Sequence, residues 1–238
     1  MLRFQYIIIK NFFRLLLRIL PTMRHLIHAD PYDEKKSYDY LRKVVRIMHR
    51  TGRIRTQVFG EEHLPKEGGY IMYPNHQGRY DGYAIVHGNP MPISVVMDKK
   101  RSNFPFVKEV IDLVRGKRME LDNLRQSMMI INEVAQEVMQ GRRYIIFPEG
   151  GYDANKKNSL WEFKSGCFKA TLKSRTPIVP VVLVDTYKAM DISYLGPVRT
   201  QVHFLQPIPY EEYKDMKTVE IAEMVRGRIQ KKLDEILK

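Results

Sequence analysis

A histidine and an aspartate stand five residues apart within residues 75–81, and together they could supply a catalytic base. A carboxylate that accepts a hydrogen bond from one imidazole nitrogen leaves the other nitrogen free to take a proton. On one continuous helix, side chains five residues apart point about 140° away from each other. His76 and Asp81 can therefore meet only if His76 lies in a loop and Asp81 in the first turn of the next helix, with Gly78 at the bend. Taken alone, the spacing favours a structural capping role.

A second candidate site residue, Glu149, lies in a turn made of Phe147, Pro148, Gly150 and Gly151. The turn follows an apolar run, and a proline with two glycines would end a strand sharply and expose backbone N–H groups. Glu149 would then point outward at the carboxyl end of the strand, where open α/β sheets place their ligands. The alternative is a tight turn with a solvent-facing glutamate. That alternative explains the glycines but not the similar arrangement at the histidine loop.

Short strand patterns alternate with helical patterns through the rest of the chain. Strands are predicted at residues 53–59, 69–73, 93–97, 143–147 and 178–184. Helices are predicted from residue 124 to a stop at Gly141, and over residues 218–237 with Thr218 as the N-cap. The spacing predicts these inward-facing residues: Leu124, Met128, Ile131, Ala135 and Val138, then Ile221, Val225, Ile229, Leu233 and Ile236. The alternation predicts an α/β fold with a mostly parallel central sheet flanked by helices.

The N-terminal residues 4–20 are mostly large and apolar, and they include Phe12 and Phe13. Four basic residues fall within one sector roughly 80° wide on a helix: Arg3, Lys10, Arg14 and Arg18. A wide apolar face beside a basic stripe is typical of a helix that lies in the membrane interface, with its basic residues toward anionic headgroups. No uncharged run reaches the ~20 residues of a spanning helix.

A second amphipathic pattern covers residues 36–50, after Pro21 and a turn at residues 29–31. Its apolar side carries Tyr38, Leu41, Val44, Val45 and Met48. We therefore predict an N-terminal amphipathic two-helix membrane-binding segment over residues 1–50, resting on the bilayer, and an α/β domain over residues 51–238. The alternative is that these helices pack on their own domain.

The net charge of +13, with a pI near 9.7, indicates anionic partners. Acidic lipid, a phosphorylated substrate, an acidic carrier protein or nucleic acid would each satisfy it. The sequence has no zinc-finger spacing, RNA-recognition signature or phosphate-loop motif, so no nucleic-acid partner is expected. A single cysteine, Cys167, excludes an internal disulfide. The expected location is the cytoplasmic face of the cell membrane, with peripheral or monotopic attachment to its anionic surface.

Four blocks of the chain, in order, resemble the glycerolipid acyltransferases of the 1-acylglycerol-3-phosphate type. The signature of that family is an Asn-His-x4-Asp block, a basic block containing Asp-Arg, a Phe-Pro-Glu-Gly block and a Val-Pro-Val block. The corresponding blocks here are residues 75–81, 119–123, 147–151 and 178–182, within a resemblance over about residues 55–205. Four blocks in the right order are far more specific than any one of them.

The resemblance implies that His76, oriented by Asp81, is the general base on the free hydroxyl of a lysophospholipid. The alkoxide would attack an acyl thioester on coenzyme A or on acyl carrier protein, with no covalent acyl-enzyme and no cofactor or metal. With 1-acylglycerol-3-phosphate as acceptor, the product would be phosphatidic acid. The implied substrate-binding residues are Arg118, Asp122, Asn123, Phe147, Pro148, Glu149, Gly150, Gly151 and Lys164.

Two departures from the family pattern affect the acceptor. The chain has Asp122-Asn123 where the family usually has Asp-Arg, and Gly151-Tyr152 where it usually has Thr-Arg or Ser-Arg. Arginines at those positions would be the expected phosphate ligands, because a guanidinium fork matches phosphate oxygens. A different lysolipid or hydroxylated lipid is therefore the alternative acceptor. A non-catalytic basic protein that binds membrane or nucleic acid is a more distant alternative.

Overall fold

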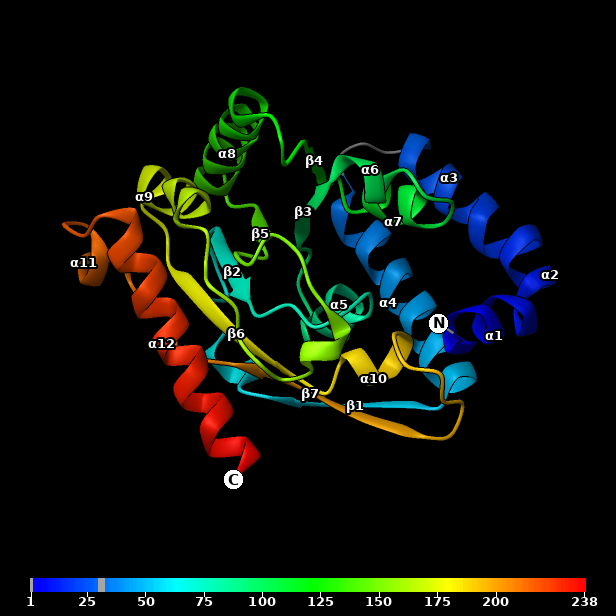
Figure 1. Ribbon diagram of the computed structural model, residues 1–238. Helices are drawn as coiled ribbons and strands as arrows, with labels where there is room; N and C mark the ends of the chain where they lie inside the picture. Colours follow the sequence, from blue (N-terminus) through cyan, green and yellow to red (C-terminus); the bar gives the residue numbers. More distant parts are fainter. Residues whose placement is uncertain (1, 30–32) are drawn as a thin grey trace.

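The computed structural model describes residues 2–29 and 33–238, and these residues form a seven-stranded sheet in the order β1-β7-β6-β2-β5-β3-β4 (Figure 1). The strands are β1 (Ile54–Phe59), β2 (Tyr70–Pro74), β3 (Ser94–Asp98), β4 (Lys117–Met119), β5 (Arg143–Ile145), β6 (Ile178–Val184) and β7 (Val198–Phe204). Every neighbouring pair is parallel except β6 and β7. The predicted α/β class with a mostly parallel sheet is confirmed.

Helices cover both faces of the sheet, and successive residues of the central strands alternate between two apolar cores. In β2, Tyr70 and Met72 face one core, whereas Ile71 and Tyr73 face the other. The first core is closed by α4 (Glu34–Gly52), α5 (Asp81–Gly88), α7 (Val107–Leu113) and α10 (Tyr187–Met190). The second is closed by α8 (Leu124–Met139), η4 (Ser165–Phe168), α9 (Lys169–Ser174), α11 (Tyr210–Tyr213) and α12 (Thr218–Leu237). The remaining short helices of the domain are η2 (Glu61–His63), α6 (Lys99–Ser102) and η3 (Ala154–Lys156).

The five predicted strands are present, with ends shifted by up to two residues, and β6 has the predicted bounds. Two strands, β4 and β7, were not predicted. β4 is three residues long and is defined by its pairing with β3, which a local pattern does not reveal. β7 does show a period-two burial pattern, since Val198, Thr200 and Val202 are buried. It is antiparallel to its neighbour β6.

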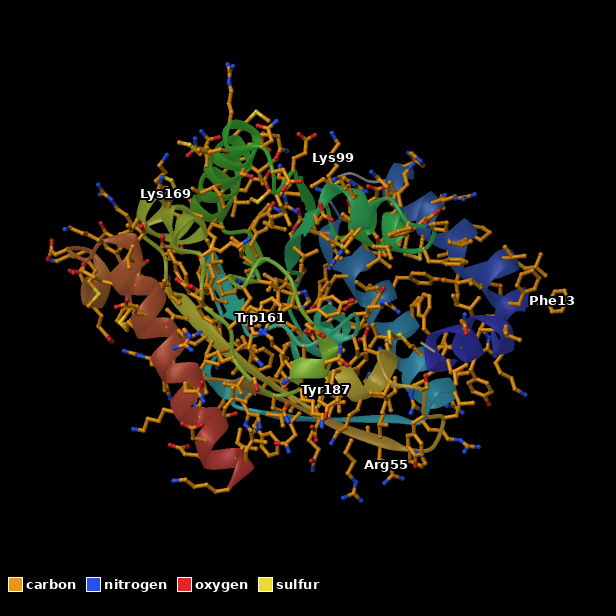
Figure 2. All side chains as sticks on the ribbon, in the orientation of Figure 1. Phe13, Arg55, Lys99, Trp161, Lys169 and Tyr187 are labelled. Atoms are coloured by element: carbon orange, nitrogen blue, oxygen red, sulfur yellow. The ribbon has the colours of Figure 1, made fainter. Side chains whose placement is uncertain are left out.

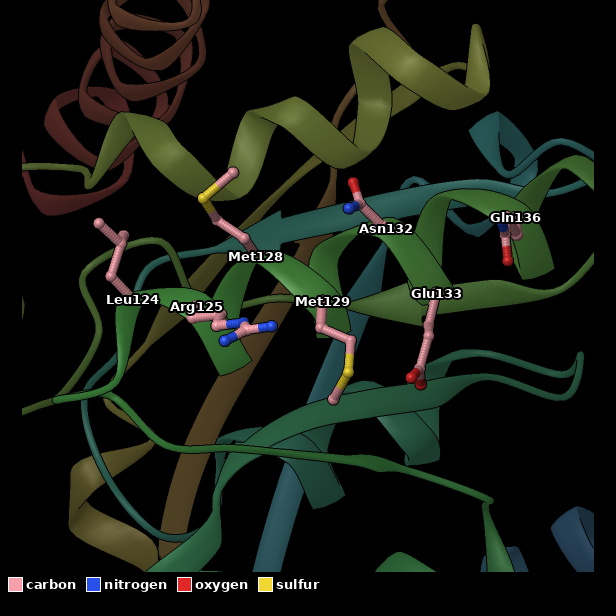
Figure 3. A pocket seen from close by; sticks show the side chains of 7 residues that line it. All are labelled: Leu124, Arg125, Met128, Met129, Asn132, Glu133 and Gln136. Carbon is pink, nitrogen blue, oxygen red and sulfur yellow. The ribbon is translucent and has the colours of Figure 1, made fainter.

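Helix α8 corrects part of the prediction for its inward face. Leu124 and Met128 are 76% and 45% exposed, whereas Ile131, Ala135 and Val138 are buried as predicted. Only the second half of α8 packs on the sheet, and its first turns extend past the core. Figure 3 shows this exposed stretch, where a hollow of about 660 Å³ is lined by these α8 residues: Leu124, Arg125, Met128, Met129, Asn132, Glu133 and Gln136.

Helix α12 has the predicted inward face, with Ile221, Val225, Ile229 and Leu233 buried and Ile236 partly buried. Thr218 is the first helical residue rather than the predicted N-cap, a position that Lys217 occupies. The Lys217 N–H donates to the Glu220 carboxylate at 2.5 Å, which satisfies one of the free N–H groups at the helix start.

The N-terminal pattern is helical but bent. It forms α1 (Leu2–Lys10), α2 (Phe12–Arg14), the π-helical turn η1 (Leu15–Ile19) and α3 (Leu20–Ala29), with the break at Asn11. Pro21 lies in α3 directly after the π-helical turn of η1, inside a continuous helical run, and it does not separate two helices as predicted. Part of the turn predicted at residues 29–31 lies outside the described residues.

One residue of the predicted basic stripe, Arg3, is wrongly assigned to the membrane face. Its side chain is only 1% exposed, and it donates hydrogen bonds to the backbone carbonyls of Gly52, Tyr194 and Gly196. A helical projection gives the direction of a side chain but not what that side chain contacts. Arg3, the first residue of the stripe, packs against the protein and not toward solvent. Lys10, Arg14 and Arg18 are exposed.

The apolar side of α4 is also turned inward. Tyr38, Leu41 and Val45 are 1–2% exposed and belong to the first core, so they are not free to rest on a bilayer as predicted. Exposed apolar side chains gather instead on the bent N-terminal helices: Ile9, Phe12, Phe13, Leu16 and Leu17. Figure 2 shows Phe13 at the outer end of these helices, pointing away from the domain. Within the described residues, no helix combines the length and apolar character needed to cross a membrane.

Candidate active site

His76 and Asp81 form the pair that the sequence predicts. β2 ends at Pro74, His76 lies in the loop that follows, and Asp81 begins α5. The His76 Nδ1–H donates to the Asp81 carboxylate at 2.7 Å, because an ionised carboxylate only accepts. No hydrogen bond within residues 2–29 and 33–238 uses Nε2 of His76, so that nitrogen is free to accept a proton.

The Asp81 carboxylate is fully buried and holds the loop as well as the imidazole. The same oxygen that binds His76 accepts the backbone N–H groups of Gln77 at 2.6 Å and Gly78 at 2.9 Å. Its place in the first turn of α5 also favours a negative charge. Gly78 has an ordinary φ; it is needed because a Cβ there would collide with the Asp191 carboxylate, not because the bend demands a left-handed residue.

The other side chains of the histidine block fix the loop to the end of β6. Asn75 exchanges two hydrogen bonds with the backbone of Leu183, at 3.0 and 2.7 Å. Gln77 donates to the same carbonyl at 2.9 Å and accepts from the backbone and hydroxyl of Thr186. The residues on both sides of His76, Asn75 and Gln77, are therefore hydrogen-bonded to the end of β6 and the residues after it. These bonds hold the loop in place and preorganise the imidazole.

Glu149 differs from the expected outward-pointing side chain. It is 4% exposed, and its Oε1 accepts the backbone N–H of His76 at 2.9 Å. Burial raises the pKa of Glu149 to about 7, against the lowering effect of the N–H groups of His76 and Trp161. Its second oxygen has no hydrogen-bond partner within the described residues. The turn after β5 thus braces the histidine loop from the neighbouring strand, and it leaves one carboxylate oxygen unused.

Two aromatic rings and a lysine complete the surroundings of the imidazole. His76 stacks on Phe147 at a centroid distance of 4.1 Å and meets Tyr152 edge-on at 4.7 Å. Gly150 has φ +69°, and the Lys164 side chain lies so close to it that a Cβ would sit 2.6 Å from the Lys164 Nζ. Of the predicted substrate-binding residues, the structure therefore brings Phe147 and Glu149 to His76, and Lys164 to Gly150 in the same turn.

The second predicted block lies apart from this centre. In the sheet order, β4 is three positions from β2, which corresponds to about 14 Å. Arg118 pairs with Asp112 at 2.7 Å, and Asn123 caps α8 by accepting the Gln126 N–H at 3.1 Å. Asp122 is 95% exposed in its side chain and reaches Lys100 at 3.9 Å. The described contacts give Asn123 a structural role and leave Arg118 and Asp122 as surface charges.

Comparison with known proteins shows the family to which the chain belongs. A family model described as Acyltransferase matches residues 55–184, a range that contains His76, Asp81 and Glu149. The chain belongs to the acyltransferase family.

The curated relatives of this acyltransferase include proteins named 1-acyl-sn-glycerol-3-phosphate acyltransferase. That of Saccharomyces cerevisiae is 28% identical over 76% of the chain, and the chain spans 60% of its length. That of Borreliella burgdorferi is 24% identical over 84% of the chain and 80% of the relative. A solved structure, the 1-acyl-sn-glycerophosphate (LPA) acyltransferase PlsC of Thermotoga maritima, covers 98% of this chain and 95% of its own. Its TM-score of 0.74 at 18% identity shows the shared fold.

Sequence reasoning did not place three further residues of this region in the site, although it noted Tyr152 as a departure from the family pattern. Arg79 lies inside the histidine block, Tyr152 follows the glutamate turn, and Arg101 belongs to α6. Arg101 lies over the Tyr152 ring at 5.4 Å. The place of Arg79 between His76 and Asp81 was the signal available for that residue. The contact of Arg101 with Tyr152 depends on the packing of separate loops, so the sequence does not reveal it.

Proposed function

We propose that this acyltransferase moves a fatty acyl group from an acyl thioester to the free hydroxyl of a lysophospholipid. The proposed acceptor is 1-acylglycerol-3-phosphate, which gives phosphatidic acid, and the donor is acyl-CoA or acyl-ACP. The observation that carries the proposal is the buried Asp81 holding His76 with Nε2 unused, inside an acyltransferase domain. The names of the curated relatives support the choice of acceptor.

In the proposed mechanism, Nε2 of His76 accepts the proton of the acceptor hydroxyl as its oxygen attacks the thioester carbonyl. The new C–O bond forms a tetrahedral oxyanion. When that intermediate collapses, the C–S bond breaks and the imidazolium returns its proton to the leaving thiolate. Asp81 stabilises the imidazolium in between.

The oxyanion needs donors near the imidazole, and the turn after β5 supplies candidates. The Gly150 N–H already donates to the Phe147 carbonyl at 3.1 Å, so the candidates are the Gly151 N–H and the Lys164 ammonium, which lies against Gly150. Glu149 serves as a positioning residue, because its hydrogen bond holds the backbone of His76 rather than the reacting atoms.

We also propose that the bent N-terminal helices attach the enzyme to the anionic, cytoplasmic face of the cell membrane as a peripheral or monotopic protein. Phe12 and Phe13 are 49% and 75% exposed, and Lys10, Arg14 and Arg18 are exposed beside them. Apolar side chains next to basic ones suit an interface of acyl chains and anionic headgroups.

The membrane proposal is tested by flotation with vesicles of phosphatidylcholine and phosphatidylglycerol. The double variant Phe12→Ser, Phe13→Ser should lose most vesicle binding, since each buried aromatic contributes about 1.5–3 kcal/mol. The control, Val219→Ser with Leu237→Ser, removes two exposed apolar residues of α12 and should bind normally. Equal binding by all three proteins would disprove this attachment, and stronger retention on DNA than on vesicles at matched salt would favour the nucleic-acid alternative.

The activity is tested by giving the purified protein labelled acyl-CoA or acyl-ACP with a panel of lysolipids. The panel contains lysophosphatidate, lysophosphatidylglycerol, lysophosphatidylcholine and monoacylglycerol. Phosphatidate should be the main product. Acylation of another panel member alone would replace the proposed acceptor, an outcome that Asn123 and Tyr152 at the positions of the family arginines make the second candidate. Failure to acylate any member with either donor would contradict the proposed function.

A further inference from the structure

A positively charged cluster adjoins the proposed base on the side of Tyr152. The Tyr152 ring meets His76 at 4.7 Å, and the Arg101 guanidinium lies 5.4 Å from the centre of the same ring. Burial and the Asp191 carboxylate raise the pKa of the Tyr152 hydroxyl, and the guanidinium groups of Arg79 and Arg101 oppose that rise, so Asp191 and both arginines lie near this side chain. The three residues follow β2, β3 and β5, whose carboxyl ends share one edge of the sheet.

Arg79 is held from one side only. Its backbone N–H donates to Asp191 at 3.0 Å, and its Nε lies 3.6 Å from the other oxygen of that carboxylate. Asp191 is 5% exposed in its side chain, whereas Arg79 is 43% exposed. A buried carboxylate thus fixes the orientation of a guanidinium that still reaches solvent.

The two lysines beside Arg101 on α6 each lie near a carboxylate, whereas Arg101 does not share in these pairs. Lys99 pairs with Glu120 at 2.5 Å, and Lys100 lies 3.9 Å from Asp122. No salt bridge of the described residues uses Arg101, whose backbone N–H is fixed by Asp98 at 3.3 Å. Its contact with Tyr152 is a cation–π interaction, which leaves the hydrogen-bonding edge of the guanidinium available.

We infer that Arg79 and Arg101, with Tyr152 between them, bind the phosphate monoester of the acceptor. This inference rests on the proposed function. In 1-acylglycerol-3-phosphate, two carbons and one ester oxygen separate the reacting hydroxyl from the phosphorus, so the phosphate must lie beside the base. Tyr152 touches His76, whereas Arg118 lies on a strand three positions away. Two guanidinium groups favour a doubly charged monoester over a diester headgroup.

The arrangement also accounts for Tyr152 at the position where the resembling family has an arginine. Arg79 and Arg101 come from other segments, so the positive charge beside the base is supplied from a different direction. Tyr152 then provides a ring against which one arginine stacks and a hydroxyl that can donate to phosphate.

The test compares steady-state kinetics of Arg101→Gln, Arg79→Gln and the control Arg125→Gln, with lysophosphatidate as the varied substrate. Arg125 lies on the exposed face of α8 and its loss makes the same change in net charge. Each site variant should raise KM at least tenfold, because a charge-assisted hydrogen bond to the phosphate is lost. Turnover at saturation should stay within about twofold, since the chemistry at His76 is untouched, and Arg125→Gln should match the wild type.

Three outcomes separate this inference from the proposed function. A raised KM with preserved turnover in both site variants supports the phosphate site. An unchanged KM in Arg101→Gln, in an enzyme that does acylate lysophosphatidate, overturns the site and leaves the function intact. A wild type that acylates only acceptors without a phosphate monoester overturns both.

Two further measurements guard the test. Arg101 is exposed, so Arg101→Gln should keep the wild-type Tm. Arg101→Lys should recover only part of the affinity, because an ammonium is a point charge and lacks the planar fork of the guanidinium.

Discussion

Two places along one sheet edge, at the central strand β2 and at the outer strand β4, are built very differently. At β2, His76 is held by a fully buried aspartate, by Glu149 and by a loop fixed to β6. At β4, Asp122 and Asn123 of the second family block are exposed, and Asn123 caps a helix. The resemblance alone gives both blocks equal standing. Burial and hydrogen bonding favour the first as the place of the proposed chemistry, and they indicate that the second contributes stability and charge.

The largest expected effect comes from His76→Ala. Removing the proposed base should lower kcat/KM by about 10²–10⁴-fold, because general base catalysis contributes a factor of that size. The side chain is 16% exposed and the loop is held by other residues, so the variant should remain folded. Initial rates with labelled thioester, with circular dichroism as the folding control, measure this. Loss of less than tenfold in a folded variant would remove His76 from the chemistry.

Asp81→Asn should lower kcat by about 10²-fold or more, because an amide cannot stabilise the imidazolium as a carboxylate does. Asp81 also accepts two backbone N–H groups, so the variant should lose about 1.5–3 kcal/mol of unfolding free energy as well. Urea unfolding and initial rates separate the two effects. A variant that loses stability but keeps its rate would reduce Asp81 to the capping role that its spacing alone favours.

Glu149→Gln should change the pH dependence of stability. Because burial raises the pKa of Glu149 to about 7, the folded protein keeps a proton that the unfolded chain releases near pH 4.5. The stability contributed by this proton is fully present below the unfolded pKa and is lost as pH rises through about 7. The neutral glutamine avoids that loss, so the variant should gain about 1–3 kcal/mol relative to the wild type between pH 5 and pH 8. Paired urea titrations measure this difference, and a difference that does not vary with pH would show that Glu149 is ionised throughout.

The smallest effect is expected at the other place along the edge, beside β4. Asn123→Ala should cost about 1 kcal/mol of stability through the lost helix cap and should leave KM for the acceptor within about twofold. Asn123→Asp, which keeps a capping oxygen, is the matched control. A tenfold rise of KM in the alanine variant alone would show that the place beside β4 binds substrate and would abolish the contrast between the two places.

The sequence was informative where the signal was local. The alternation of short strand patterns with helical patterns predicted the mostly parallel sheet, and the five-residue spacing predicted the loop-to-helix geometry that pairs His76 with Asp81. β4 has three residues and exists through its partner β3, so no pattern of its own could announce it. β7 did carry an alternating pattern, in residues 198–204, that was overlooked.

The failures concern contacts between distant segments. The inward turn of Glu149 depends on a free N–H at His76, seventy-three residues away. The cluster of Arg79, Arg101 and Tyr152 joins three loops that only the strand order brings together. Leu124 and Met128 fit a helical stripe, but the sheet beneath α8 ends before it reaches them.

The buried Arg3 has a mechanical consequence. Its guanidinium links α1 to the end of α4 and to the loop before β7 through four backbone carbonyls, which restrains the movement of the N-terminal helices relative to the α/β domain. If the restrained N-terminal helices attach the protein to a bilayer as proposed, the whole protein can move only by lateral diffusion and by rotation about the membrane normal. His76 would then be held at one height and one inclination above the lipids. Which acceptor molecules come to His76 would depend on how far each can rise out of its leaflet, rather than on the motion of the protein.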